Sequence, residues 1–276
     1  MAEGLFIPSA DGRVEPTEHA RGPWDPRALH GGAPAALITS VFEAMQPGAE
    51  LPIARLGFEF LKPIPFAELE VRTEIVRDGR RVQELSAELM TVPDGGASRG
   101  ETIGRASALR IQAVPEGLPD PDDRRQRPGP ESVRSLPGPE QGKTVKFALN
   151  DTDTNSLATT GMEMSWLTDP WSLGPGQVWM RLRQPLLPGQ EASPLVRLAA
   201  TADFGNGISA ELRFDRYLFI NADLTIHLWR RPQGEWIGLD AKTVLMDGGV
   251  GTAESVLHDT LGPVGRAVQT LVVQPR

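Results

Sequence analysis

The chain has 276 residues, with a hydrophobic content of 39%, a charged content of 23% and a net charge of −8. This length suits one large domain or two small ones, and the composition is that of a soluble globular protein. The acidic balance argues against a nucleic-acid-binding surface, and the absence of cysteine excludes disulfides, zinc–thiolate sites, iron–sulfur clusters and cysteine nucleophiles.

The amino-terminal segment carries no targeting signal of the usual kind. Residues 1–12 lack a basic region followed by an apolar core, as a signal peptide would have. No apolar run approaches the roughly 20 residues needed to span a bilayer. We therefore expect a cytoplasmic protein that makes no membrane contact.

The first half is predicted to form one helix followed by strands. Apolar residues recur at helical spacing within 35–45, and Pro47-Gly48 ends the pattern. Small residues, including Gly31 and Gly32, crowd the start of this helix and suit a close approach of something to it. Alternation over 69–75 and 83–89, on either side of Asp78-Gly79, predicts a strand hairpin, and 103–111 is a last strand.

A proline-rich segment with little to bury follows at residues 114–143, and its composition is typical of an extended linker. It divides the chain into two domains, residues 1–113 and 144–276. In the second, Ser193 is a plausible N-cap and Pro194 opens a helix over 194–204. Strands are predicted at 218–229, 235–244, 252–257 and 265–273.

The two halves repeat one another. Ile103-Gly104-Arg105-Ala106 returns as Val264-Gly265-Arg266-Ala267, while Lys62-Pro63 and Asp78-Gly79 return 169 residues later as Arg231-Pro232 and Asp247-Gly248. Markers in a common register indicate a duplicated unit, a helix followed by an antiparallel meander. Polar residues present in one copy only are candidates for chemistry: Asp223 stands where the first copy has Ala54, and Gln269 where it has Ala108.

The ordered motifs resemble those of the double-hotdog acyl-CoA thioesterases, the family typified by bacterial acyl-CoA thioesterase II. The segments that carry this resemblance are Leu29-His30-Gly31-Gly32, Phe60-Leu61-Lys62-Pro63, Arg77-Asp78-Gly79-Arg80, Ala202-Asp203-Phe204, Asn221-Ala222-Asp223, Glu235-Trp236 and Val268-Gln269. No single motif is specific, but their succession is.

The resemblance implies an α+β tandem hotdog fold with two antiparallel sheets, each wrapped around a central helix. It also implies a thioesterase that hydrolyses a fatty or related acyl-CoA, without a metal or an organic cofactor, as a monomer or a homodimer of double hotdogs. The acyl chain is expected between helix and sheet, beside Leu37, Val41 and Phe42.

The family's catalytic group is an Asp, a hydroxyl residue and a Gln, which the resemblance places on Asp223, Thr243 and Gln269, with Thr243 one position beside the family's hydroxyl. Thioester hydrolysis needs a positioned water, a proton acceptor and a donor to the oxyanion. Asp223 would activate the water, and the amide and hydroxyl would orient it. The N-terminus of the first helix, at His30, Gly31 and Gly32, would bind the substrate and stabilise the oxyanion.

Each of these residues also has a structural interpretation. Asp223 belongs to a polar row with Asn221, Thr225 and His227, which is typical of a solvated sheet face. Gln269 fits an edge position, Thr243 is a common strand residue, and Gly31-Gly32 suits tight packing.

Two other functions stay open. One is a non-catalytic acyl-CoA-binding protein with the same fold. The other is a hotdog enoyl-CoA hydratase that uses Asp25 and His30, which lie five residues apart just before the first helix. The Gly and Asn of the hydratase motif are absent here, and a structural role at the helix N-terminus is the alternative for His30.

Overall fold

The computed structural model describes residues 3–45, 51–92, 100–113, 135–145 and 155–276. Its helices are η1 (Ala10–Gly12), η2 (Glu18–Ala20), α1 (Gly32–Ala44), η5 (Pro139–Gln141), the π-helix η6 (Leu157–Gly161), α2 (Pro194–Ala202) and α3 (Gly205–Ile208). Its strands are β1 (Phe6–Pro8), β2 (Val14–Pro16), β3 (Ile53–Phe60), β4 (Leu69–Asp78), β5 (Val82–Thr91), β6 (Thr102–Ile111), β7 (Met162–Trp166), β8 (Gly176–Leu182), β9 (Tyr217–Asn221), β10 (Asp223–Leu228), β11 (Ile237–Met246), β12 (Val250–Asp259) and β13 (Gly262–Pro275).

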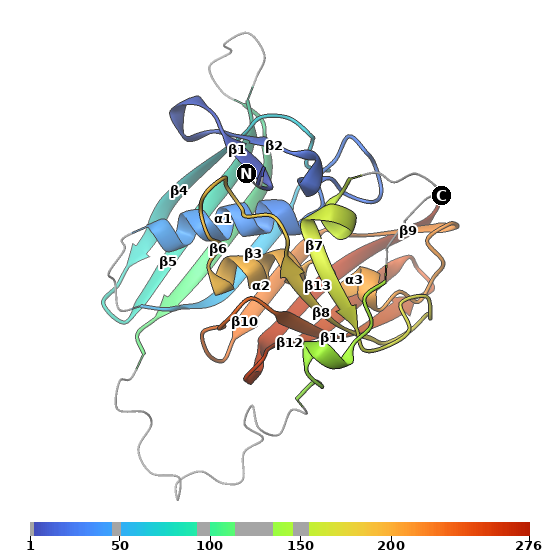
Figure 1. The fold of residues 1–276 in the computed structure, drawn as a ribbon. Helices are drawn as coiled ribbons and strands as arrows, with labels where there is room; N and C mark the ends of the chain where they lie inside the picture. Colours follow the sequence, from blue (N-terminus) through green and yellow to red (C-terminus); the bar gives the residue numbers. More distant parts are fainter. Residues whose placement is uncertain (1–2, 46–50, 93–99, 114–134, 146–154) are drawn as a thin grey trace, which may run out of the picture.

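All of these strands belong to one antiparallel sheet, in the order β1-β2-β4-β5-β6-β3-β10-β13-β12-β11-β8-β7, with β9 beside β13 (Figure 1). The two halves have the same strand order when each is read from its outer edge to the middle of the sheet. In this reading β4-β5-β6-β3 of the first half corresponds to β11-β12-β13-β10 of the second half. Pairing of β3 with β10, Phe58 opposite Leu224, joins the two halves. The prediction of two sheets is therefore corrected to one continuous sheet, since the inner edges of the repeats hydrogen-bond to each other.

Each long helix packs on strands of its own half, α1 on β4 and β5 and α2 on β8 and β10 to β12. The two helices also pack on each other along the inside of the curved sheet (Figure 1). The helices pack on the apolar face of the sheet because side chains alternate between its two faces. In β5, for example, Leu85, Ala87 and Leu89 are buried and line the core, whereas Glu84 and Glu88 point outward. The α+β character and the antiparallel meanders are as expected.

The predicted helix boundaries hold to within a few residues. Ser193 caps α2 as expected, with its Oγ accepting a hydrogen bond from the Val196 N–H at 3.1 Å, and Pro194 is the first helical residue. The helix ends at Ala202, two residues before the expected end. The helix α1 begins at Gly32, three residues earlier than the apolar pattern suggests, because small residues there carry no periodic signal.

The strand predicted over 218–229 is interrupted at Ala222. Asn221 lies opposite Leu271, and Thr225 lies opposite Val268, so four steps along this strand match three along β13. One extra residue is a β-bulge, which shifts the alternation of side chains between the two faces. Asn221 consequently faces the inside of the sheet and Asp223 the outside, although they are two residues apart.

Most of the predicted linker, residues 114–134, lies outside the described residues. Its last part packs on the second half, where Trp179 Nε1 donates to the Pro137 carbonyl at 2.6 Å and Ser165 Oγ to the Pro139 carbonyl at 2.6 Å. The division into domains at 113 and 144 stays a prediction. Among the described residues, no helix is both long and apolar enough to cross a membrane.

The fold buries one imidazole without a hydrogen bond. His258 on β12 is 0% exposed, and neither ring nitrogen has a partner in the described part of the chain. Burial lowers the pKa of His258 to about 4, against the opposing effect of Asp240 and Asp259, while Arg230 lowers it further. The folded protein therefore holds this ring neutral.

This burial makes stability depend on pH. Between the pKa of unfolded histidine, about 6.5, and that of His258, about 4, only the unfolded chain binds the proton, so stability falls as pH falls through this window. The free energy of unfolding of the wild type should fall between pH 7 and pH 4.5. We expect this fall to be about 2 kcal/mol smaller in His258→Leu, as measured by urea unfolding at both pH values. His227→Leu, at an exposed strand position, is the matched control. Parallel losses in His258→Leu and the wild type would contradict the prediction.

Candidate functional site

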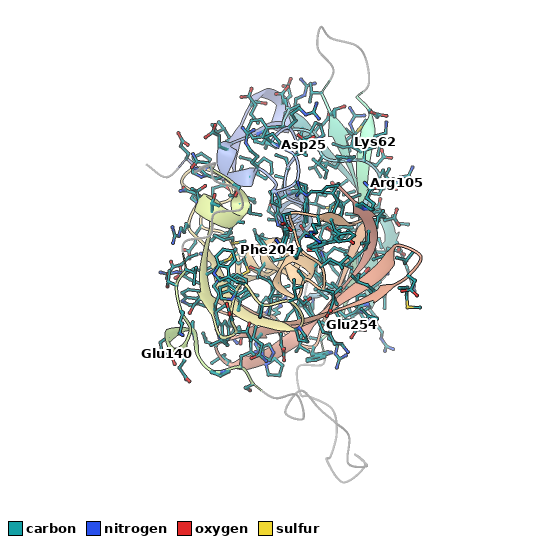
Figure 2. The ribbon with its side chains drawn as sticks, turned by 90° about the vertical axis from the view of Figure 1, so that its right-hand side faces the viewer. Asp25, Lys62, Arg105, Glu140, Phe204 and Glu254 are labelled. Atoms are coloured by element: carbon teal, nitrogen blue, oxygen red, sulfur yellow. The ribbon has the colours of Figure 1, made fainter. Side chains whose placement is uncertain are left out.

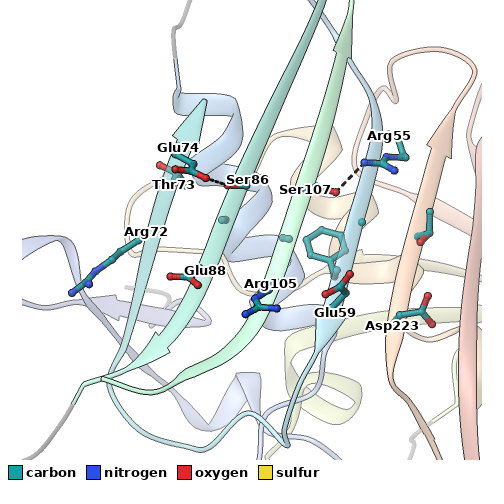
Figure 3. Close-up of a pocket in the computed structure, with 15 residues that line it drawn as sticks. Arg55, Glu59, Arg72, Thr73, Glu74, Ser86, Glu88, Arg105, Ser107 and Asp223 are labelled. Atoms are coloured by element: carbon teal, nitrogen blue, oxygen red, sulfur yellow. Dashed lines mark hydrogen bonds between the residues drawn. The ribbon is translucent and has the colours of Figure 1, made fainter. Parts of the chain in front are cut away.

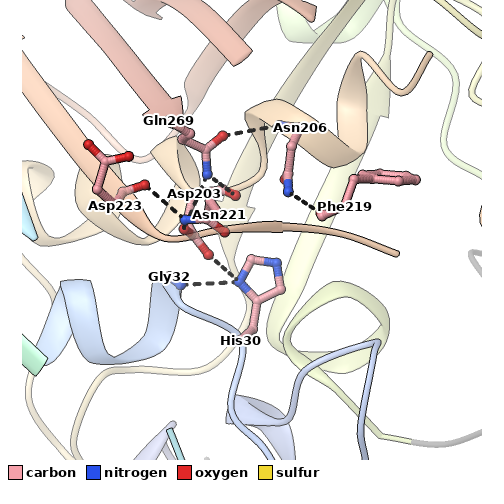
Figure 4. Close-up of polar contacts among 8 residues, drawn as sticks. All are labelled: His30, Gly32, Asp203, Asn206, Phe219, Asn221, Asp223 and Gln269. Carbon is pink, nitrogen blue, oxygen red and sulfur yellow. Dashed lines mark hydrogen bonds and ion pairs between the residues drawn. The ribbon is translucent and has the colours of Figure 1, made fainter. Parts of the chain in front are cut away.

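Four polar side chains converge on the inner face of the sheet, where the N-terminus of α1 meets the C-terminus of α2 (Figure 4). We call them the Asp203 cluster: His30 precedes α1, Asp203 follows α2, Asn221 ends β9 and Gln269 lies in β13. Asp203 is 3% exposed and Gln269 1%. A carboxylate buried to this extent needs several donors.

The two oxygens of Asp203 have different partners. Oδ1 accepts from Asn221 Nδ2 at 2.8 Å and from Gln269 Nε2 at 3.3 Å, and the same Gln269 nitrogen donates to the Asp203 backbone carbonyl at 3.0 Å. Oδ2 lies 2.9 Å from His30 Nδ1. The amides from β9 and β13 therefore fix one side of the carboxylate and leave the other to the imidazole.

His30 Nδ1 has two close polar neighbours, the Asp203 carboxylate and the Gly32 backbone N–H. Nδ1 of His30 lies 2.9 Å from the Asp203 carboxylate and also 3.1 Å from the Gly32 N–H. A nitrogen that accepts from Gly32 carries no proton, so the carboxyl group must then carry it; otherwise Nδ1 carries the proton and donates to Asp203. In either arrangement a single hydrogen bond joins the two side chains.

The helix ends add an electrostatic contribution. The C-terminus of α2 carries a partial negative charge from the helix dipole, which disfavours the Asp203 carboxylate there. The N-terminus of α1 carries a partial positive charge and faces the same carboxylate, which favours it. The approach is close: a Cβ built on Gly31 would lie 2.7 Å from Asp203 Oδ2, and one on Gly32 would collide with the Ala200 carbonyl. Glycine at both positions is what allows the two helix ends to meet.

Gln269 also holds the short helix α3 in place. Its Oε1 accepts from the Asn206 backbone N–H at 3.1 Å, so its amide bridges Asp203 and α3. At the far end of α3, Ser209 Oγ donates to the Gly205 carbonyl at 2.9 Å, and it therefore accepts from Thr243 Oγ1 at 2.8 Å. Thr243 lies two strands from Gln269, across Ala253, and reaches the Asp203 cluster only through α3.

Asp223 lies apart from these residues. Its carboxylate accepts from the Thr270 N–H at 2.6 Å on the outer face, while its backbone carbonyl accepts from Asn221 Nδ2 (Figure 4). It lines an open groove of about 620 Å³ across the outside of the first half, among charged side chains that include Arg55, Glu59 and Arg105 (Figure 3). The bulge at Ala222 turns Asp223 to the outer face, whereas Gln269 points to the inner face, so the structure does not bring the two side chains together.

An apolar cavity of about 50 Å³ opens beside the cluster. His30 and Asn206 supply its polar side chains, and its remaining lining consists of Pro23, Trp24, Ala158, Met164, Trp166, Phe204, Gly207, Ile208 and Phe214. Phe204 stacks on the His30 ring with 4.1 Å between centroids and is labelled near the middle of the view in Figure 2. An apolar group that occupied this cavity would lie against His30, the residue that links the cavity to Asp203.

Of the predicted site residues, the structure brings His30, Gly31, Gly32 and Gln269 together and leaves Thr243 and Asp223 outside. Sequence reasoning did not select Asp203, Asn221 or Asn206. One signal for Asp203 was present: an acid directly after a helix opposes the helix dipole, and such a residue needs a compensating partner or a function.

The pairing of Asp25 with His30 that the alternative hydratase function would need is not made in the described structure. Asp25 pairs with Arg27 at 2.9 Å, and this hydrogen bond lowers the pKa of Asp25 to about 2, which makes it a weak base. Among the described residues, no three His, Asp or Glu side chains converge as metal ligands would.

Comparison with known proteins places these elements in a family. The sequence matches the acyl-CoA thioesterase N-terminal domain over residues 20–111 and the acyl-CoA thioesterase C-terminal domain over residues 115–273. No curated protein matches the chain.

Solved structures share the fold at low identity. A candidate thioesterase from Novosphingobium aromaticivorans is 18% identical, with 97% of this chain and 98% of that chain covered and a TM-score of 0.70. A hot dog protein of unknown function from Alicyclobacillus acidocaldarius is 15% identical, with 97% and 95% covered and a TM-score of 0.68. Acyl-CoA thioesterase II of Mycobacterium marinum is 16% identical, with 90% of each chain covered and a TM-score of 0.61.

The close approach of the helix ends predicts an unusual response to alanine. Replacing a helical glycine with alanine ordinarily stabilises by up to about 1 kcal/mol. Gly32→Ala should instead destabilise the fold by about 1–3 kcal/mol, because the new Cβ meets the Ala200 backbone carbonyl, which cannot rotate away. Denaturant unfolding measures the difference. Gly248→Ala, with no atom within 4 Å of the new Cβ, is the control, and a stabilised Gly32→Ala would contradict the packing.

Proposed function

The chain belongs to the acyl-CoA thioesterase family, a family of thioester hydrolases, and we propose that it hydrolyses an acyl-CoA with the Asp203 cluster as its catalytic centre. One observation carries the choice of residues. A buried carboxylate, oriented by two amides and paired with an imidazole, lies beside an apolar cavity whose polar side chains are His30 and Asn206. The acyl group would occupy the cavity and place its carbonyl at this polar end.

Asp203 is the proposed general base. It would take a proton from a water molecule as the water oxygen attacks the thioester carbonyl carbon. Collapse of the tetrahedral intermediate breaks the C–S bond and releases the thiolate of coenzyme A, which takes up the proton that Asp203 had received. A thiol pKa of about 8.5 makes this a good leaving group, so a strong general acid is not needed.

The amides of Gln269 and Asn221 would keep the carboxylate in the orientation that abstracts this proton. Both donate to Oδ1. Oδ2, which pairs with His30 at 2.9 Å, is the oxygen that would accept the proton of a water molecule bound beside His30. A hydrogen-bonded amide from β13 and another from β9 hold the base from separate strands, so its position does not depend on a single loop.

The oxyanion would form at the N-terminus of α1. The Gly32 N–H is directed at His30 Nδ1, and the Gly31 N–H makes no hydrogen bond in the described part of the chain. We assign the Gly31 N–H as an oxyanion donor, assisted by the dipole of α1, because a fixed backbone donor is available without reorganisation. Thr243 would act indirectly, by holding α3 through Ser209.

A hydratase mechanism has no support in the geometry, because Asp25 is paired with Arg27 and not with His30. A protein that binds acyl-CoA without hydrolysing it would have the same cavity, and the assay below distinguishes it by the absence of released thiol.

Two matched substitutions decide which carboxylate acts. Asp203→Asn should lower kcat about 100-fold or more, since the amide cannot accept the proton of the attacking water, whereas Asp223→Asn should leave kcat close to the wild-type value. The measurement is release of coenzyme A thiol from acyl-CoAs with a thiol-reactive dye, to which a protein without cysteine adds no background. Loss of turnover in Asp223→Asn, with Asp203→Asn active, would return the role to Asp223.

A further inference from the structure

The cavity beside the Asp203 cluster is small, with a volume of about 50 Å³, and this volume limits the length of an acyl chain that could enter it. We propose that the enzyme acts on short acyl groups, of roughly four or five carbons with the carbonyl included, an inference that rests on the proposed thioesterase function. It is argued below from the volume of the cavity, from the rigidity of its walls and from the packing of the space a longer chain would need.

The volume admits only a few carbon atoms. A cavity of about 150 Å³ holds one benzene ring, and one water molecule needs roughly 10–15 Å³. The cavity here has about 50 Å³. It therefore has room for roughly two carbons by the benzene comparison and for roughly three to five groups by the water comparison. A methylene or methyl group is about the size of a water molecule, and the middle of this range is roughly three or four carbons. With the carbonyl carbon at His30, this corresponds to a butyryl or a pentanoyl group.

The walls belong to ordered, buried elements. Met164 and Trp166 lie on β7, Ala158 on η6 and Ile208 on α3, and the side chain of each is less than one-tenth exposed. Strand β7 is held by its pairing with β8, and α3 by the hydrogen bonds of Gln269 and Thr243. Close-packed walls of this kind give way little, because extra methylenes force side chains out of their rotamers.

The outer wall is an aromatic group. Trp24 stacks on Phe214 with 5.3 Å between ring centroids and meets Phe219 edge-on at 5.0 Å, and Phe214 lies 4.7 Å from Phe219. Three rings in mutual contact support one another and present flat apolar surfaces. A short aliphatic acyl group fits beside them, whereas a long chain would have to part them.

The alternative space for a long chain is already filled. Leu37 and Phe42 on α1, where a chain between helix and sheet would run, are 3% and 0% exposed and belong to the packed core. Arg110 closes the end of this helix by donating to the Phe42 and Met45 carbonyls. The groove on the outer face is larger, but its charged lining does not suit an acyl chain.

The test is a chain-length profile. Coenzyme A release is measured with acetyl-, butyryl-, octanoyl-, dodecanoyl- and palmitoyl-CoA, each below its micelle-forming concentration. We expect kcat/KM to peak at butyryl-CoA and to be at least about tenfold lower for dodecanoyl-CoA, since a single methylene in a tight pocket can change it 10–200-fold. A wild-type enzyme that turns over dodecanoyl- or palmitoyl-CoA as well as butyryl-CoA would overturn the inference and leave the thioesterase function intact.

Variants of the wall tie the profile to this cavity. Met164→Ala should move the optimum toward octanoyl-CoA by deepening the cavity. Met180→Ala is the matched control, because Met180 is the buried partner of Met164 on β8 and does not line the cavity; its profile should stay that of the wild type. A peak at butyryl-CoA that Met164→Ala leaves in place would assign the selection to another part of the molecule.

A second variant guards against loss of folding in the first. Ala158→Leu fills the cavity from η6 and should favour acetyl-CoA over butyryl-CoA relative to the wild type. Unchanged preference in a folded Ala158→Leu protein would also overturn the inference. Absence of release from every acyl-CoA would instead remove the thioesterase function itself, and the chain-length inference with it, so the two failures are distinct.

Discussion

The site depends on one buried carboxylate. Asp203 ends a helix whose dipole disfavours it, in a place that solvent hardly reaches. It is stable there because the N-terminus of α1, the imidazole of His30 and the amides of Asn221 and Gln269 all face it. These partners come from both halves of the chain, so the carboxylate is satisfied only when α1 and α2 pack with their ends aligned and β9 and β13 lie beneath them.

Because the unit is duplicated, there are two places where the N-terminus of one long helix lies against the C-terminus of the other, and the residues at these two places differ. At the opposite end of the pair, Glu43 near the C-terminus of α1 accepts from Ser193 Oγ at the N-terminus of α2, at 2.5 Å, and burial raises the pKa of Glu43. The residue that corresponds to Gln269 is Ala108, which is fully buried and cannot donate. The amide that fixes the carboxylate is thus present in the second half only, and the two ends have different chemical capabilities.

The hydrogen bonds of Asp203 are connected to the apolar cavity through Gln269 and α3. Gln269 joins the carboxylate to α3, and α3 forms one wall of the cavity through Ile208. A change in the orientation of Gln269 would therefore alter both the proposed base and the cavity proposed to hold the acyl group. Under the proposed function, coupling of this kind would keep the reacting carbonyl and the proton acceptor aligned, and such alignment contributes strongly to rate.

Much of this was readable from the chain itself. The repeat, the helix beginning at Pro194 and the alternating strands follow from local patterns of apolar and turn residues, because such patterns depend on neighbours in sequence. The family was indicated by the resemblance of the ordered motifs to those of a known family. Gln269 and the glycines at 31 and 32 could also be selected, the first by comparison of the two halves and the others by their lack of a side chain where a helix begins.

Tertiary structure alone decided the rest. Period-2 alternation predicted one strand through residues 218–229 and one common face for Asn221 and Asp223, but the pairing of both segments with β13 inserts a bulge at Ala222 and separates them. The union of the repeats into one sheet likewise depends on hydrogen bonds between distant edges. The partners of the buried Asp203 and the size of the cavity depend on which side chains meet across the fold, and spacing along a chain carries no information about that contact.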